Sequence, residues 1–270
     1  MAKSTSQALG GLHAVVTGGG SGIGAAIAAR LIGQGARCTL MGRNLARLQA
    51  QCATLAAECE AADGLGPHVA AQVCDIGDEA SVQRAFAAAV QAFGPVDILV
   101  NNAGQVETAP LSRTSLAMWQ QSLQVNLTGT FLCSREVAEG MAARRFGRII
   151  NVASTASLKG YAYVAAYCAA KHGVLGLTRA IALELARKGV TVNAVCPGYT
   201  DTDIVAQAVS KITEKTGRSP EAAREALAQT NPQGRLVQPE EVAHTVCWLA
   251  SREAGAMNGQ AVAVCGGEWM

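Results

Sequence analysis

The composition of this 270-residue chain is typical of a compact globular protein, because half of its residues are hydrophobic and only 16% are charged. The net charge is +2 and no long basic block occurs, which argues against a nucleic-acid partner. The nine cysteines contain no C-x-x-C pair, and no run of about 18 apolar residues is present. We therefore expect reduced thiols, a cytoplasmic location, no metal site and no membrane span.

The strongest local signal is a glycine-rich turn near the start of the chain. Residues 12–16 form an apolar run that predicts a buried strand, and the small residues after Gly22 predict a helix. The glycines between them are spaced as Gly18-x-x-x-Gly22-x-Gly24. A strand, a glycine turn and a helix bring free backbone N–H groups to one point, which suits a phosphate group. A flexible glycine loop is the alternative interpretation, and the rest of the chain argues against it.

Apolar segments and helical periodicities alternate along the rest of the chain. Further strands are predicted at residues 37–41, 69–74, 96–100, 148–152, 190–195 and 260–264. Helices are predicted at residues 45–55, 78–93, 116–144, 161–187 and 239–250. This alternation predicts one α/β domain over residues 1–270, built on a doubly wound, Rossmann-like sheet of seven parallel strands.

Residues 199–235 interrupt the alternation. They are rich in charge, weakly helical and contain no predicted strand. They follow the carboxyl end of the strand at 190–195, and ligands bind at this edge of such sheets. We expect a small substrate lid here, and a surface insertion without a function is the alternative.

Five motifs then occur in the order and spacing of the short-chain dehydrogenase/reductase family, which the chain resembles from residue 12 to residue 267. The motifs are Thr17-Gly18-x-x-x-Gly22-Ile23-Gly24, Asn101-Asn102-Ala103-Gly104, Ser154, Tyr167-x-x-x-Lys171 and Pro197-Gly198. The chain is most similar to the single-domain branch, which contains ketoacyl-thioester reductases, polyketide ketoreductases and secondary alcohol dehydrogenases. The resemblance implies an enzyme that acts on CH–OH or C=O groups of a small molecule, and a homotetramer.

The resemblance also implies four catalytic residues. Tyr167 would transfer the proton, and Lys171 lies four residues further on, on the same helical face. Because a free tyrosine has a pKa of about 10, we expect the nearby ammonium to lower the pKa of Tyr167. Ser154 would hold the substrate oxygen, and Asn126 would support a water-linked proton relay from Lys171. An exposed helical pair is the alternative interpretation of Tyr167 and Lys171, and an ordinary polar helix residue is that of Asn126.

The end of the second predicted strand bears on the choice of cofactor. NAD enzymes usually carry an acidic residue there to bind the ribose 2′-hydroxyl, but Gly42 takes this place and Arg43 follows. A guanidinium suits a 2′-phosphate, so NADP is the predicted cofactor and NAD is the alternative. The resemblance adds further cofactor-binding residues, with helix capping as the alternative role of Asp75: Gly18, Ser21, Gly22, Ile23, Gly24, Asn44, Asp75, Ile76, Asn102, Ala103, Gly104, Tyr167, Lys171, Pro197, Gly198, Thr200 and Thr202.

A largely apolar substrate pocket is expected beside Ser154, from Val106, Leu158, Tyr161, Val164, Tyr199 and Ile204. The predicted function is NADP-dependent hydride transfer between the nicotinamide and a ketone or secondary alcohol, with a 3-oxoacyl thioester or a related carbonyl compound as substrate. An NAD-preferring hydroxyacyl or small-alcohol dehydrogenase is the first alternative. A dinucleotide-binding regulator without catalysis is the second, and the presence of all four catalytic residues argues against it.

Overall fold

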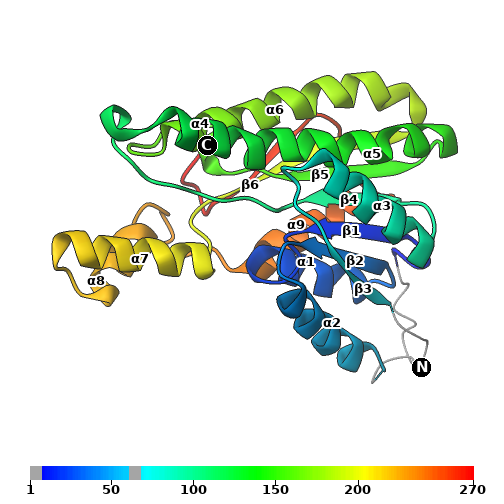
Figure 1. Ribbon diagram of the computed structural model, residues 1–270, viewed down its shortest axis with the longest axis horizontal. Coiled ribbons are helices and arrows are strands. Elements are labelled where there is room, and N and C mark those ends of the chain that lie inside the picture. The colour runs from blue at the N-terminus through cyan, green and yellow to red at the C-terminus, as the bar shows by residue number, and fades with distance from the viewer. Residues whose placement is uncertain (1–7, 61–67) are drawn as a thin grey trace.

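Seven parallel strands form one sheet at the centre of the protein (Figure 1). The computed structural model describes residues 8–60 and 68–270. The strands are β1 (His13–Thr17), β2 (Arg37–Gly42), β3 (Val69–Val73), β4 (Ile98–Asn101), β5 (Gly147–Val152), β6 (Val190–Pro197) and β7 (Ala261–Val264). Their order is β3-β2-β1-β4-β5-β6-β7, and every neighbouring pair is parallel. This confirms the predicted fold class, and the strand order reverses between β1 and β4, where doubly wound sheets bind ligands.

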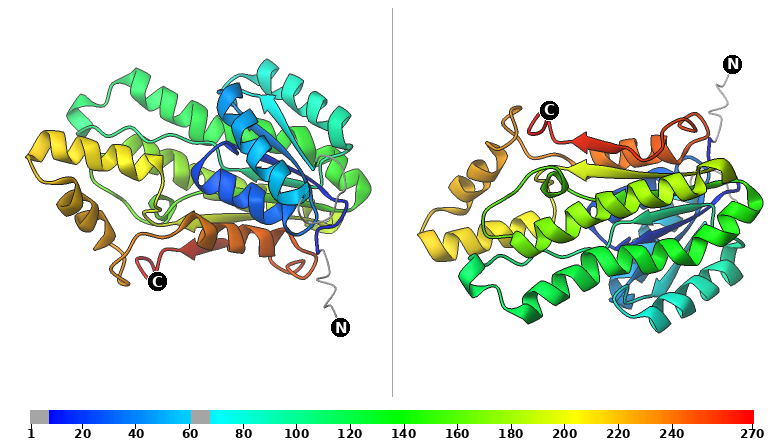
Figure 2. Two further views of the ribbon diagram at one scale, coloured as in Figure 1. Left: turned by 90° about the horizontal axis from the view of Figure 1, so that it is seen from below. Right: turned by 90° about the horizontal axis from the view of Figure 1, so that it is seen from above.

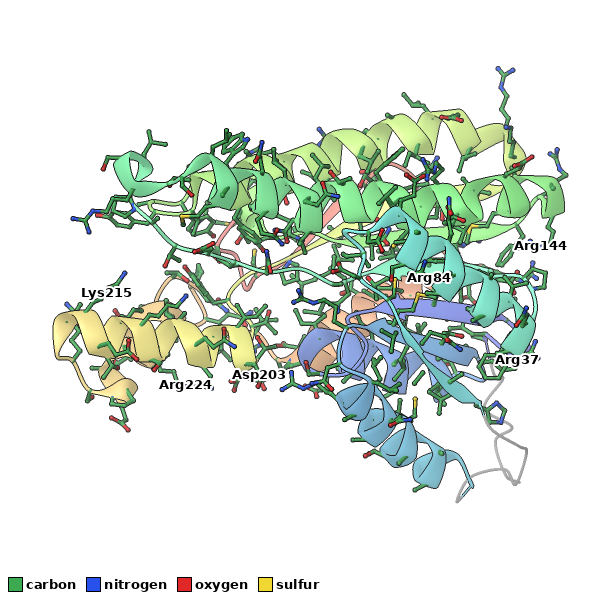
Figure 3. The ribbon with its side chains drawn as sticks, in the orientation of Figure 1. Arg37, Arg84, Arg144, Asp203, Lys215 and Arg224 are labelled. Carbon is green, nitrogen blue, oxygen red and sulfur yellow. The ribbon has the colours of Figure 1, made fainter. Side chains whose placement is uncertain are left out.

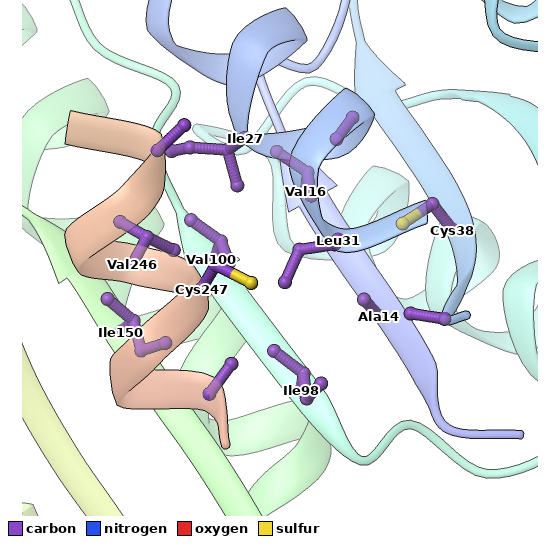
Figure 4. Packing of buried hydrophobic residues seen from close by; sticks show 14 of the residues in the cluster. Ala14, Val16, Ile27, Leu31, Cys38, Ile98, Val100, Ile150, Val246 and Cys247 are labelled. Carbon is purple, nitrogen blue, oxygen red and sulfur yellow. The ribbon is translucent and has the colours of Figure 1, made fainter. Parts of the chain in front are cut away.

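Helices cover both faces of the sheet, as Figure 2 shows from two sides. They are α1 (Gly22–Ile32), α2 (Leu45–Glu60), α3 (Glu79–Phe93), α4 (Leu116–Leu123), α5 (Gly129–Arg144), α6 (Ala165–Leu185), α7 (Asp203–Thr216), α8 (Pro220–Ala228) and α9 (Pro239–Ala250). The side chains of a strand alternate between the two faces. Ala14 and Val16 accordingly pack with α1 and α9 (Figure 4), whereas Val15 packs with α3 and α5.

Two predicted helices differ from the structure. The helix predicted at 116–144 is divided by a single π-helical turn, Gln124–Thr128, between α4 and α5. The helix predicted at 161–187 begins only at Ala165, because Tyr163 has a φ of +68°, in the left-handed region that a right-handed helix excludes. Residues 161–164 therefore belong to the loop after β5, beside the candidate site.

The segment predicted as a lid contains two helices, α7 and α8, which project beyond the carboxyl edge of the sheet (Figure 1). Val205, Ala228 and Leu236 form a small buried cluster beneath them. An ion pair between Arg224 and Asp201 joins α8 to the chain that leads into α7. Helices α7 and α8 thus have a small hydrophobic core of their own, and their action as a substrate lid stays a prediction.

Candidate active site

The glycine turn between β1 and α1 has the backbone geometry that its sequence predicted. Gly18 and Gly22 have φ values of +66° and +52°, which residues with side chains rarely adopt. Gly24 is required by packing, because a Cβ there would collide with the Gly18 carbonyl oxygen and lie 2.5 Å from Asn102 Nδ2. The turn is therefore too tight for any of these three residues to carry a side chain.

The turn also exposes the amino end of α1 to a ligand. In the described part of the chain no side chain caps α1 at Ser21, and its first turn holds no acidic residue. The first N–H groups of a helix need an acceptor, and the helix dipole favours a negative one. Thr202, which precedes α7, lies against this point, because a Cβ at Gly22 would stand 3.1 Å from its methyl group. The structure thus places Ser21, Gly22, Ile23 and Thr202 around one site that suits a pyrophosphate.

Hydrogen bonds tie the glycine turn to the end of β4. Thr17 Oγ1 accepts from the backbone N–H groups of Asn102 and Ala103, both at 3.0 Å. Asn102 Nδ2 donates in return to the carbonyl oxygens of Thr17, at 3.0 Å, and Gly18, at 3.3 Å. Thr17 is not among the predicted site residues. Its place immediately before Gly18 was the available signal.

The predicted adenosine end lies along the carboxyl ends of β2 and β3. Arg43 is exposed, and Asn44 Oδ1 accepts from Arg47 N at 3.0 Å at the start of α2. Arg47, which was not predicted, points its Nη1 at Ser21 Oγ, 3.4 Å away, and at Asp203 Oδ2, 3.3 Å away (Figure 3 labels Asp203). Two guanidinium groups thus belong to the segment that follows β2.

Two residues after β3 have different environments. The exposed Asp75 Oδ1 accepts from Gly77 N at 2.9 Å, while Ile76 is buried. Asp78 caps α3 through Ala80 N and Ser81 N, so helix capping by Asp75, the alternative role, is wrong. Asp75 therefore shapes the turn after β3.

The catalytic residues proposed from the motifs come together at the carboxyl ends of β5 and β6. Ser154 follows β5, and its Oγ accepts from Ala156 N at 3.0 Å, which leaves the hydroxyl proton free to donate. Tyr167 and Lys171 project from α6, and Lys171 Nζ lies 5.7 Å from the centre of the Tyr167 ring. Lys171 Nζ also donates to the Val152 carbonyl at 2.9 Å.

The electrostatics of this pair differ from the prediction. The pKa of Tyr167 is raised to about 12, chiefly by burial, while a hydrogen bond from Ser154 acts in the opposite direction. Burial also lowers the pKa of Lys171 to about 8, so that its ammonium group loses its proton more readily than that of an exposed lysine. The expected lowering of the Tyr167 pKa is therefore wrong, because desolvation of the phenolate outweighs the hydrogen bond from Ser154.

Asn126 lies in the π-helical turn. Such turns often occur at functional sites. Its side chain is fully buried and bonds both ways with Gln105: Nδ2 donates to the carbonyl at 3.0 Å, and Oδ1 accepts from the N–H at 3.2 Å. A Cβ at Gly104 would stand 2.8 Å from Asn126 Oδ1 and 3.8 Å from Lys171 Nζ. Gly104 thus brings the loop after β4 close to both side chains, whose relay role stays a prediction.

The loop after β6 joins this centre to the lid. β6 ends at Pro197, and Gly198 N donates to the Val264 carbonyl at 3.1 Å. Thr200 Oγ1 donates to the Gly198 carbonyl at 3.0 Å, and Thr200 pairs with Val237 in an isolated bridge. The loop is thus held from β7 and from the chain before α9.

The predicted substrate-binding residues lie in different surroundings. Tyr199 packs against the small cluster beneath the lid, and its ring meets that of Tyr161 edge to face with 6.3 Å between centres. Leu158 packs against the buried cluster beneath α6, Val164 borders a shallow cavity with Glu107, and Ile204 is exposed in the first turn of α7. The structure brings Tyr161 and Tyr199 together but does not bring Ile204 into the same contact set.

A family model described as short chain dehydrogenase matches residues 12–213. The chain is 43% identical over 256 residues to a Streptomyces violaceoruber protein named as a ketoacyl reductase of the granaticin polyketide synthase, which covers 94% of this chain and 92% of that relative. It is 38% identical over 253 residues to a D-beta-hydroxybutyrate dehydrogenase of Cupriavidus necator, over 93% of this chain and 95% of the relative. A crystal structure of an actinorhodin polyketide ketoreductase variant with NADPH matches with a TM-score of 0.89 and 39% identity, over 95% of this chain and 97% of that one.

Two properties of the described residues bear on location and metals. No helix among residues 8–60 and 68–270 is long and apolar enough to cross a membrane. Within the same ranges, no group of three His, Cys, Asp or Glu side chains is placed to hold a metal ion. The cytoplasmic location stays a prediction.

Proposed function

Because the chain belongs to the short-chain dehydrogenase/reductase family, whose oxidoreductases act on CH–OH and C=O groups, we propose that it is an NADP-dependent ketone reductase. The proposed substrates are 3-oxoacyl thioesters or related carbonyl compounds. The observation that carries this proposal is the convergence of Ser154, Tyr167 and Lys171 at the carboxyl edge of the sheet, beside the glycine turn. The likeness to ketoacyl reductases supports the direction and the substrate class.

The residues present fit a bound dinucleotide. The uncapped amino end of α1 would hold the pyrophosphate, Arg43 the 2′-phosphate, and Lys171 the ribose next to the nicotinamide. Residues of the β6–α7 segment, Pro197, Gly198, Thr200 and Thr202, would line the nicotinamide end. When bound, the cofactor supplies or accepts the hydride. Glycines at the turn leave the space that a pyrophosphate needs, which is the structural feature that favours this ligand.

The chain's own groups perform the proton chemistry in this proposal. Ser154 donates a hydrogen bond to the substrate oxygen, where negative charge grows during reduction. Tyr167 donates its phenolic proton to that same oxygen and is in its protonated form at neutral pH, since its pKa is raised to about 12. Lys171, fixed by the Val152 carbonyl, lies close enough to favour the phenolate that this transfer leaves behind. Asn126 holds the Gln105 loop and completes the relay that resupplies the proton.

An NAD-preferring hydroxyacyl dehydrogenase is the second candidate. The 38% identity to a D-beta-hydroxybutyrate dehydrogenase favours it.

A steady-state assay distinguishes these functions. The purified protein is given acetoacetyl-coenzyme A with NADPH or NADH, and 3-hydroxybutyrate with NADP⁺ or NAD⁺, and the nicotinamide absorbance is followed. Reduction of the thioester with a kcat/KM at least about tenfold higher for NADPH supports the proposal. A preference for NAD⁺ and 3-hydroxybutyrate supports the second candidate. Tight dinucleotide binding without turnover of either substrate contradicts both and indicates a regulator.

We also propose that the enzyme is a homotetramer. Leu116, Phe131 and Leu183 are exposed on α4, α5 and α6, and exposed large apolar side chains favour association. Light scattering on the eluting protein gives the mass directly, and a monomer of 27.7 kDa would contradict the proposal.

A further inference from the structure

A buried carboxylate at the end of the chain lies beside the proposed substrate site. Glu268 follows β7 by four residues, and its side chain is only 2% exposed. Its Oε1 accepts from the Tyr161 hydroxyl and lies 3.1 Å from Lys159 Nζ. The Tyr161 hydroxyl also lies 2.7 Å from Thr155 Oγ1. One carboxylate of the C-terminal tail thus binds two residues of the loop after β5, one of which contacts the residue next to Ser154.

The carboxylate is also packed against the loop after β6. Glu268 Oε2 is buried and makes no hydrogen bond within the described part of the chain. A Cβ at Gly198 would stand 2.9 Å from this oxygen, so the glycine allows the carboxylate to approach the backbone. A buried carboxylate with one unpaired oxygen is costly, and it persists only where its surroundings hold it in place. The tail is therefore anchored by specific contacts, although most chain ends are poorly ordered.

Tyr161 connects this anchor to the substrate side of the site. Its ring meets the Tyr199 ring edge to face, and the nearby Tyr199 hydroxyl contributes to the raised pKa of Tyr167. Tyr199 in turn packs against the cluster beneath α7 and α8. The tail, the loop after β5 and the lid therefore meet at the two aromatic rings.

We propose that Glu268 is a positioning residue, which fixes Tyr161 and, through it, the aromatic wall against which the substrate binds. The proposal rests on the proposed function, because it assumes that a ketone substrate binds against this aromatic wall. Glu268 touches neither the reacting atoms nor the glycine turn, so its largest effect is on substrate binding, although it also packs against Gly198 at the proposed nicotinamide end.

The test compares Glu268→Leu and Glu268→Gln with the parent protein, and Glu253→Gln serves as the control because Glu253 is exposed. Loss of a charge-assisted hydrogen bond raises the KM for acetoacetyl-coenzyme A about tenfold in Glu268→Leu, while kcat and the Kd for NADPH change much less than this KM does. Glu268→Gln keeps an oxygen that can accept from Tyr161, so its KM lies between the two. Glu253→Gln behaves as the parent.

Hydrogen–deuterium exchange of the peptide covering residues 158–163 is measured on the same proteins without substrate. Faster exchange in Glu268→Leu is expected, because the loop loses its attachment to the tail. This readout separates the two proposals: faster exchange in a protein whose parent reduces no ketone refutes the proposed function and shows that Glu268 anchors the loop independently of it.

Two results overturn the positioning role. One is an unchanged KM together with unchanged exchange in Glu268→Leu. The other is a parallel fall of kcat, NADPH affinity and melting temperature, which indicates a general loss of structure. If Glu268→Leu does not fold, Tyr161→Phe carries the same test, since it removes the hydroxyl that donates to Glu268 and keeps the ring.

Discussion

Tyr167 and Lys171 share one face of α6, and both are shifted from their ordinary ionisation by removal from water. Burial raises the pKa of Tyr167 to about 12 and lowers that of Lys171 to about 8. The i, i+4 spacing predicts their proximity, but it does not report how deeply the pair is enclosed. The spacing therefore predicts that the two side chains lie close together, but the expected direction of the shift in the Tyr167 pKa is wrong.

Arg43 is the residue on which the cofactor prediction depends. Arg43→Ala is expected to weaken NADPH binding about tenfold to a hundredfold, because it removes charge-assisted hydrogen bonds to a 2′-phosphate, each contributing about 1.5–3 kcal/mol. NADH, which lacks that phosphate, should bind the variant and the parent equally. Titrations that follow nicotinamide fluorescence measure both constants.

Arg47→Ala provides the matched comparison in the same segment. It removes the contacts with Ser21 and Asp203 while Arg43 stays in place. A loss of NADPH affinity in Arg47→Ala alone would assign the phosphate to Arg47, and equal losses for NADPH and NADH in Arg43→Ala would contradict a 2′-phosphate contact altogether.

The strand–turn–helix element around the glycine turn combines the features that sequence predicts well. Glycine spacing, an apolar strand and a small-residue helix all indicate the same local structure, and the seven strands lie within two residues of their predicted ends. The failures occur where tertiary contacts override local pattern. The π-helical turn at Asn126 and the left-handed Tyr163 interrupt segments whose periodicity is helical, and both lie beside the site.

Glu268 and Thr17 were missed for a related reason. Thr17 acts through hydrogen bonds to a turn 85 residues away, and Glu268 through a loop 107 residues away. No local pattern reports contacts of this separation. The family motifs supplied Asn102 and Ser154 and include Thr17, but the hydrogen bonds of Thr17 and Glu268 become visible only when the strands are assembled.

Gly24→Ala tests the packing of this element. The added methyl group would collide with the Gly18 carbonyl and approach Asn102 Nδ2, and such overpacking costs about 1–3 kcal/mol. We expect a lower melting temperature and weaker binding of NADPH and NADH alike, since the pyrophosphate site is shared. Thermal unfolding and fluorescence titration measure the two effects.

Gly176→Ala is the control, because it also lies inside a helix, α6, and a Cβ there would meet nothing within 4 Å. Replacing a glycine inside a helix by alanine stabilises by about 0.5–1 kcal/mol, so this variant should be as stable as the parent or more so. Normal cofactor binding by Gly24→Ala would show that the tight turn is unnecessary.

Across the whole molecule, the carboxyl and amino ends of the strands have different roles. The carboxyl edge carries the proposed chemistry, while the amino edge holds a fully buried histidine, His13. Its Nδ1 lies 2.8 Å from the Gly94 carbonyl, to which it donates, and its Nε2 lies 2.9 Å from Thr39 Oγ1, from which it accepts. These contacts connect β1, β2 and the end of α3 through a neutral imidazole.

The stability of the protein should therefore depend on pH through His13. Burial lowers the pKa of His13 below its ordinary value of 6.5, so the folded protein binds this proton less tightly than the unfolded chain does. The contribution of His13 to the free energy of unfolding is fully present above about pH 6.5 and decreases as the pH falls below that value. Thermal unfolding between about pH 8 and about pH 5.5 measures the decrease, which His13→Gln should reduce.

His172→Gln is the control for that series, because His172 is exposed on α6. It should keep the pH dependence of the parent. An identical dependence in His13→Gln and the parent would show that other groups govern acid stability.

The central claim, that Tyr167 transfers the proton for carbonyl reduction, is tested most directly by Tyr167→Phe. The measurement is kcat for acetoacetyl-coenzyme A together with the Kd for NADPH. We predict a loss of about a hundredfold or more in kcat, the contribution of a general acid, with a much smaller change in the Kd for NADPH because the glycine turn, Arg43 and Lys171 remain. A Tyr167→Phe protein that reduces the thioester as fast as the parent would contradict the mechanism.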